Sequence, residues 1–133
     1  MKKLVLEDDG YCFACGPKNS SGLRLGFRNE NGRTRAAFIP GKLHQGFKDI
    51  VHGGIITAVL DEAMVKAVLS EGVEALTAEI SVRFRSPLLT GDRSVVEAEI
   101  KNMGKRLIET SARLMKSDGT VVAEAEAKLL RNA

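Results

Sequence analysis

The residues of this chain whose types and spacing could do chemistry are a glycine pair and an aspartate. Gly53 and Gly54 directly follow His52, and Asp61 lies nine residues after that histidine. The segment 55–69, which contains Asp61, is mostly apolar and predicts a buried helix. A helix N-terminus carries unpaired N–H groups and the positive end of the dipole, and glycine permits close approach to the backbone. The pattern therefore predicts a carbonyl-polarising helix end, with an acid or base about two turns along the same helix.

Asp61 is expected on a different side of this helix from the other charged residues. At about 100° per residue, Glu62 and Lys66 fall in one stripe, which we interpret as the solvated face with a weak i,i+4 pair. Asp61 projects roughly 140° away from Lys66. The projection predicts a partly buried Asp61 without a cation from its own helix. The alternative is a purely structural aspartate, hydrogen-bonded by a neighbouring strand or a partner subunit.

Composition limits the function classes. The chain has 133 residues, which predicts one domain over 1–133, and its net charge of +3 comes from Lys and Arg spread along the sequence. With five Phe, one Tyr and no Trp, a nucleic-acid surface built on stacking is not expected. No apolar run is long enough to span a membrane, and the N-terminus lacks a hydrophobic signal core. We therefore expect a cytoplasmic protein with neither nucleic-acid nor membrane partners.

Two cysteines form a Cys-x-x-Cys pair near the N-terminus, at Cys12 and Cys15. Such a pair is compatible with half a zinc site, a redox pair or a disulfide. A tetrahedral zinc site needs two more ligands, and the two histidines of the chain, His44 and His52, do not have finger spacing. A redox pair would need a preceding strand and a following helix. We favour a compact knuckle within an N-terminal segment, 1–22, that packs on the domain and binds no metal.

The remaining sequence predicts an α+β fold. Alternating apolar residues and intervening turns predict six strands, at 23–28, 33–39, 76–84, 94–101, 107–115 and 121–130. Asn31-Gly32 is a strong hairpin signal between the first two strands. The loop 40–51 precedes the helix, and Gly72 ends it. A helix that is apolar on most sides must be covered. We expect a curved antiparallel sheet wrapped around it, which is the hotdog arrangement.

With this layout the chain resembles the hotdog acyl-CoA thioesterases, in their PaaI-like or mammalian-type branch. The resemblance rests on His52-Gly53-Gly54, on Asp61 at the spacing found in the family, and on Thr77 within Leu76-Thr77-Ala78-Glu79. The opening Cys12-Phe13-x-Cys15-Gly16-x-x-Asn19 and the segment 83–87 also match, so that the resemblance covers residues 12–130.

The resemblance implies a role for each matching residue. The Gly53 N–H would bind the thioester carbonyl, and Asp61 would act as general base on water or as nucleophile. Thr77 would help to place the water, and His52 would orient the loop. In the family, glycine and aspartate come from different subunits. The resemblance therefore implies a homodimer with shared sites that pairs into a tetramer, an acyl-CoA substrate and no cofactor.

Further residues are expected to contact the substrate. Some family members carry Asn six residues before the histidine, where this chain has Gly46, so Gln45 or His44 would have to replace it. Exposed arginines can meet the phosphates of coenzyme A. The residues expected to bind substrate are Gly54, Gln45, His44, Arg83 and Arg85.

Two other functions are alternatives on the same fold. A hydroxyacyl dehydratase would place a helix Glu fourteen residues after a loop His, but counting from His44 reaches Ala58. A non-catalytic acyl-CoA-binding or regulatory protein is the stronger alternative, because a fold does not fix a function.

Overall fold

The computed structural model describes residues 3–132, so residues 1, 2 and 133 of the expected domain and N-terminal segment lie outside the described range. The elements in chain order are β1 (Arg28–Glu30), β2 (Arg33–Phe38), the 3-10 helix η1 (Lys42–His44), α1 (Gly53–Leu69), β3 (Ala75–Phe84), β4 (Ser94–Met103), β5 (Leu107–Lys116) and β6 (Val121–Arg131). The predicted order of strands around one α-helix is confirmed.

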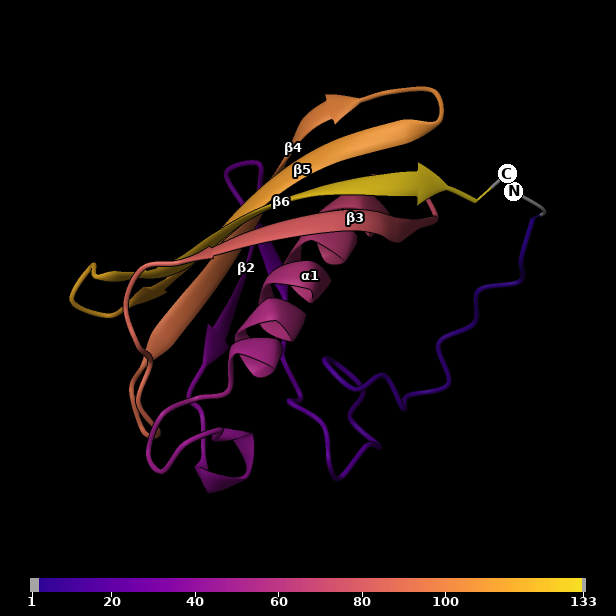
Figure 1. Cartoon of the computed structure of the whole chain (residues 1–133). Coiled ribbons are helices and arrows are strands. Elements are labelled where there is room, and N and C mark those ends of the chain that lie inside the picture. Colours follow the sequence, from indigo (N-terminus) through magenta and orange to yellow (C-terminus); the bar gives the residue numbers. More distant parts are fainter. Residues whose placement is uncertain (1–2, 133) are drawn as a thin grey trace.

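The strands form one antiparallel sheet in the order β1-β2-β4-β5-β6-β3. The sheet curves around α1, which lies along its inner face and packs against β2 to β6 (Figure 1). β3 follows α1 in sequence but lies at the far edge of the sheet, next to β6. This arrangement confirms the predicted hotdog fold. No helix within residues 3–132 has the length and apolar character needed to cross a membrane.

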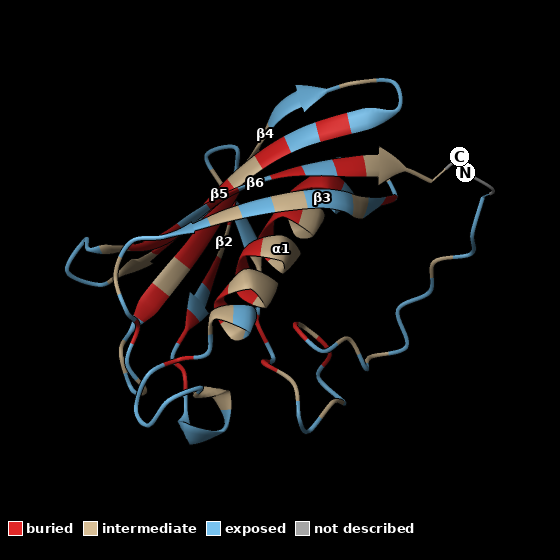
Figure 2. Ribbon diagram, viewed as in Figure 1, coloured by how far each residue is buried: buried red, intermediate tan, exposed pale blue. Residues whose placement is uncertain are grey.

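Helix α1 is held by apolar contacts on its sheet side. Figure 2 shows its buried residues on the side that faces the strands, and they are Ile56, Val59, Leu60, Ala63, Met64, Ala67 and Val68. The strand residues beneath it include the small side chains Ala123, Ala125 and Ala127 of β6, all buried. Small side chains let a helix approach a sheet closely, so the alanine pattern of β6 and the apolar pattern of α1 are complementary.

The first strand differs from the prediction. The hairpin turn is present, with Asn31 and Gly32 both at positive φ, but β1 is limited to Arg28–Glu30. The residues before it bond to the N-terminal segment instead: Leu23 N–H donates to the Phe13 carbonyl at 2.8 Å, and Leu25 N–H donates to the Ala14 carbonyl at 2.9 Å. The apolar pattern of 23–27 thus reflects packing under that segment rather than a place in the sheet.

The N-terminal segment lies along the side of α1 that the sheet leaves open (Figure 1). Near its start, the Asn132 side chain bonds both backbone groups of Leu4, at 2.8 and 2.7 Å. Further along, Gly16 N–H donates to the Cys12 carbonyl at 2.8 Å and closes a tight turn. A Cβ on Gly16 would clash with the backbone N of Cys12. Only glycine therefore fits this turn without a backbone shift.

Gly16→Ala is expected to disrupt the N-terminal turn. A methyl group forced against rigid backbone costs about 1–3 kcal/mol, and this turn must move to admit it. We expect faster proteolysis and faster amide exchange in residues 10–25, with the sheet unaffected. Gly26→Ala is the matched control, since a Cβ there meets nothing within 4 Å. Equal protection in the two variants would contradict this prediction.

Candidate functional site

Asp61 is half-buried near the middle of α1, as the projection predicted. The Thr77 hydroxyl of β3 donates a hydrogen bond to Asp61 Oδ1 at 2.7 Å. No Lys or Arg among residues 3–132 forms an ion pair with this carboxylate. The structure therefore brings together the two residues that were singled out on separate elements, and leaves Oδ2 of Asp61 without a hydrogen-bond donor from the described chain.

A β-bulge turns Thr77 towards the helix. Thr77 pairs with Leu129 of β6 and Glu79 pairs with Lys128, so that Ala78 is an extra residue in β3. Leu129 is fully buried, which places Thr77 on the inner face of the sheet. In a regular strand, alternation would place Thr77 on the same face as Glu79. The bulge reverses that relation, a use of bulges that is common beside active sites.

The first turn of α1 leaves one backbone donor free. His52 is the N-cap, and its Nδ1 accepts a hydrogen bond from Gly54 N–H at 2.8 Å. The N–H groups of Ile55 and Ile56 reach the His52 carbonyl at 3.0 and 3.2 Å. Gly53 N–H has no acceptor within residues 3–132. Of the two glycines, Gly53 is thus the one whose N–H is available to a ligand, whereas the N–H of Gly54 is bonded to the N-cap residue His52.

Phe84, which the sequence reasoning did not single out, lies against this helix end. A Cβ on Gly53 would sit 3.5 Å from the Phe84 ring. Phe84 is nevertheless 53% exposed, so an apolar surface borders the free N–H. Its place on the apolar side of the alternating β3 pattern is the signal that could have found it.

The loop before α1 is fixed by its own polar groups. His52 N–H donates to the His44 carbonyl at 2.9 Å, and His44 Nδ1 accepts from Gly41 N–H at 2.9 Å. The Gln45 side chain accepts from Asp49 N–H at 3.0 Å. His44 and Gln45, both expected to touch substrate, therefore have side-chain acceptors that already hold the loop in shape.

Arg83 and Arg85 are not brought to the helix end of their own chain. They flank Phe84 in sequence and line a hollow of about 520 Å³ on the sheet face opposite α1. Arg85 pairs there with Glu124 at 3.3 Å. In the same hollow, Glu97 accepts from Arg113 at 3.0 Å. This hollow is lined by charges of both signs.

The prediction of an exposed Glu62 was wrong. Glu62 is half-buried and accepts a hydrogen bond from the Cys12 thiol at 3.3 Å. The helical projection treated α1 as if only the sheet covered it, whereas the N-terminal segment covers this stripe as well. Burial, then the hydrogen bond with Cys12 and the charge of Glu62, raises the pKa of the Cys15 thiol to about 11.

Known proteins share sequence and fold with this chain. The family described as the thioesterase superfamily matches residues 48–123. A candidate esterase of Archaeoglobus fulgidus is 26% identical over 102 residues, and the match spans 77% of this chain and 66% of the relative, just under two thirds of its length.

Solved structures share the fold. The PaaI protein of the E. coli phenylacetic acid degradation operon superposes with a TM-score of 0.78 at 20% identity, over 84% of this chain and 81% of that one. A Streptococcus mutans protein bound to acetyl CoA gives a TM-score of 0.76 at 17% identity, over 80% and 87% of the two chains. A thioesterase of Streptococcus pneumoniae, in a structure with an Asp-to-Ala change, gives 0.77 at 14% identity, over 82% and 91%.

Proposed function

Since the chain belongs to the thioesterase superfamily, we propose that it hydrolyses the thioester bond of an acyl- or aryl-acyl-CoA. The observation that carries this proposal is the combination of a free Gly53 N–H at the start of α1 with Asp61 farther along the same helix, where Asp61 accepts a hydrogen bond from Thr77 of β3. The first group suits a carbonyl oxygen, and the second suits a water molecule. Thioester hydrolysis needs both.

The Gly53 N–H would stabilise the charge that forms on the carbonyl oxygen. As water attacks the thioester carbon, the oxygen becomes an oxyanion, and a fixed donor at a helix N-terminus binds this state more strongly than the ground state. One such donor contributes about 10²–10³ to the rate. The cap bond between His52 and Gly54 holds the first turn in place, so Gly53 is positioned before substrate arrives.

Asp61 would take a proton from the attacking water. The water oxygen then bonds to the acyl carbon, and the tetrahedral intermediate collapses by breaking the carbon–sulfur bond. The proton held by Asp61 passes to the departing thiolate, so that the products are a carboxylic acid and coenzyme A thiol. The Thr77 hydroxyl fixes Oδ1 of Asp61, which leaves Oδ2 to accept from the water.

A complete site requires two chains. Asp61 and Gly53 are eight residues apart on one helix, about 12 Å by the helical rise, too far for one carboxylate to reach water at a carbonyl held by its own Gly53. β3 is an edge strand of the sheet. Two-fold pairing of edge strands would bring the partner's helix alongside and supply its carboxylate. We infer a homodimer with two shared sites, which can pair further into a tetramer.

Related proteins support this proposal. One neighbour by structure is bound to acetyl CoA, and a Streptococcus pneumoniae neighbour contains coenzyme A. That pneumococcal thioesterase has been crystallised with an aspartate replaced and with a threonine replaced, two residues that are 16 positions apart in its chain. Asp61 and Thr77 are also 16 positions apart.

The test is a hydrolysis screen over aryl, short, medium and long acyl-CoA substrates, with free thiol as the readout. Turnover of at least one class, abolished by Asp61→Asn, would support the proposal. Tight acyl-CoA binding by calorimetry with no thiol release from any class would instead support a non-catalytic acyl-CoA-binding protein.

Thr77→Val is expected to lower kcat by about 10- to 100-fold. Val keeps the shape of Thr but removes the donor to Asp61, and a hydrogen bond to a charged group contributes about 1.5–3 kcal/mol. Thr77→Ser keeps the hydroxyl and should retain most of the activity. If both variants lost activity equally, packing rather than the hydrogen bond would be responsible.

A further inference from the structure

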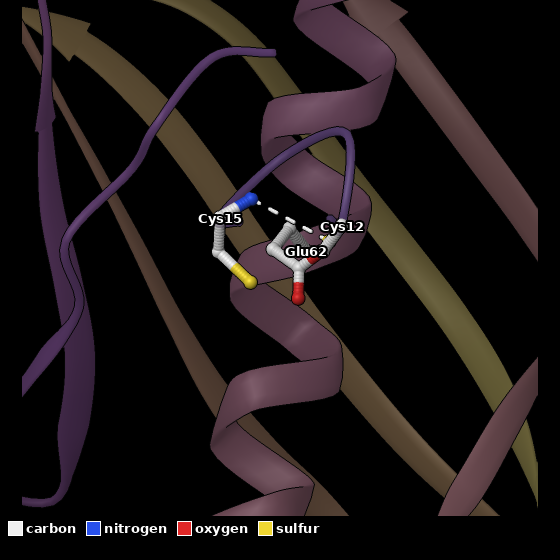
Figure 3. Close-up of side chains that lie close together, drawn as sticks. All are labelled: Cys12, Cys15 and Glu62. Atoms are coloured by element: carbon white, nitrogen blue, oxygen red, sulfur yellow. Dashed lines mark hydrogen bonds between the residues drawn. The ribbon is translucent and has the colours of Figure 1, made fainter. Parts of the chain in front are cut away.

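A second cluster of reactive side chains lies on the other side of α1 from the sheet. Cys12 and Cys15 of the N-terminal segment face Glu62 of the helix (Figure 3). One ligand atom from each, the two sulfurs and a carboxylate oxygen, all lie within 4.8 Å of one another. All three residues are half-buried. The sequence showed only the two cysteines, and the fold adds a third metal-binding group from 50 residues away.

The turn at residues 12–16 holds the sulfur atoms of Cys12 and Cys15 close together. Cys15 N–H donates to Cys12 Sγ at 3.4 Å, and Gly16 N–H closes the turn on the Cys12 carbonyl at 2.8 Å. The Cys12 Sγ lies 3.3 Å from Glu62 Oε2, so the segment and the helix already meet through these groups.

We propose that Cys12, Cys15 and Glu62 bind one zinc ion, with water as the fourth ligand. Two sulfurs and a carboxylate oxygen are a donor set that suits Zn²⁺, whereas Mg²⁺ and Ca²⁺ prefer oxygen alone. At Zn–S and Zn–O distances of about 2.3 and 2.0–2.2 Å, tetrahedral ligand atoms lie about 3.5–3.8 Å apart. In the cluster, Cys12 Sγ and Glu62 Oε2 are 3.3 Å apart, and no two of the three ligand atoms are more than 4.8 Å apart.

The charge around the cluster fits a divalent cation. Two thiolates and one carboxylate carry three negative charges, of which the ion neutralises two. Lys66, one turn along α1 from Glu62, supplies the remaining positive charge. The bound ion would tie the N-terminal segment to the helix that carries Asp61, independently of what the active site hydrolyses.

Cobalt titration of the full-length protein tests the site. Reduced, chelator-treated protein should bind one Co²⁺ per chain with a thiolate-to-cobalt charge-transfer band, and one equivalent of Zn²⁺ should remove the band. Cys12→Ser and Cys15→Ser should each lose most of the band. Glu62→Gln should weaken Co²⁺ binding by at least about 10-fold, since a ligand is lost. Glu71→Gln changes an exposed acid two residues after α1; it is the matched control and should bind Co²⁺ as wild type does.

X-ray absorption of the zinc-loaded wild type gives an answer that does not depend on variants folding. The zinc ion is expected to have two sulfur neighbours, with oxygen atoms as its other neighbours. The proposal is overturned if fully reduced wild-type protein shows no charge-transfer band, if the band persists in the double Cys12→Ser and Cys15→Ser variant, or if zinc has only nitrogen and oxygen neighbours. A Cys12–Cys15 disulfide that forms in air, with no metal uptake after reduction, would likewise overturn it in favour of a redox pair.

Discussion

Asp61→Asn is expected to reduce kcat by about 10²–10⁴-fold, the usual contribution of a positioned general base. The amide has the shape of the carboxylate and can still accept from the Thr77 hydroxyl, so the fold and the hydrogen bond at 2.7 Å should survive. What is lost is the ability to take a proton from water. KM should change little, because the Gly53 N–H, the donor proposed for the carbonyl, is untouched.

Steady-state thiol release on the best acyl-CoA from the screen, with thermal melting in parallel, checks this expectation. Glu71→Gln is a suitable control because it makes the same kind of change in an exposed acid just beyond the C-terminal end of α1. A folded Asp61→Asn protein that turns over at a near-normal rate would reject Asp61 as the base. A variant that melts far below wild type would point instead to the structural reading of this aspartate.

The sequence was a good guide to elements whose pattern is local. The start of α1 at the glycine pair, the Asn31-Gly32 turn and the half-burial of Asp61 all follow from spacing within a few residues. Each depends on helix or turn geometry that the chain determines locally. For this reason the family resemblance and the residue reasoning led to the same candidate side chains.

The sequence was a poor guide where a distant segment decides the outcome. One extra residue in β3 reverses the face of Thr77, and nothing in an alternating pattern shows which residue is skipped. Glu62 is half-buried because a segment 50 residues earlier covers it, which no single-helix projection contains. The availability of Gly53 rather than Gly54 depends on where the His52 ring lies. These three features define the candidate sites, and each could be recognised only from the folded structure.

Mixed dimers of Asp61→Asn and Gly53→Pro chains are expected to recover activity that neither variant has alone. In a shared-site dimer, the intact Gly53 of the first chain meets the intact Asp61 of the second, while the other site carries both changes. Because one of the two sites in the dimer is intact, a purified heterodimer should reach about half of the wild-type rate. Each homodimer has every site damaged and should be nearly inactive.

The backbone at Gly53 is compatible with the Gly53→Pro change. Proline is favoured at the first position of a helix, where its missing N–H removes no helical bond. His52 already has φ −62° and ψ 134°, an extended conformation that a following proline permits. Gly53→Ala distinguishes the loss of the N–H donor from steric crowding at this position. It keeps the N–H and places its Cβ at an ordinary 3.5 Å from the Phe84 ring. Gly53→Ala should therefore stay active while Gly53→Pro loses about 10²–10³ in rate.

Two differently tagged chains, co-expressed and purified through both tags, provide the heterodimer, and mass spectrometry of the intact complex verifies it. Both homodimers must melt as folded proteins for the comparison to count. Recovery towards half of the wild-type rate places Gly53 and Asp61 of one site on different chains. A verified, folded heterodimer that stays as inactive as its parents would refute the shared site. The 12 Å between the two residues on one helix, estimated from the helical rise, would then have to be bridged within a single chain.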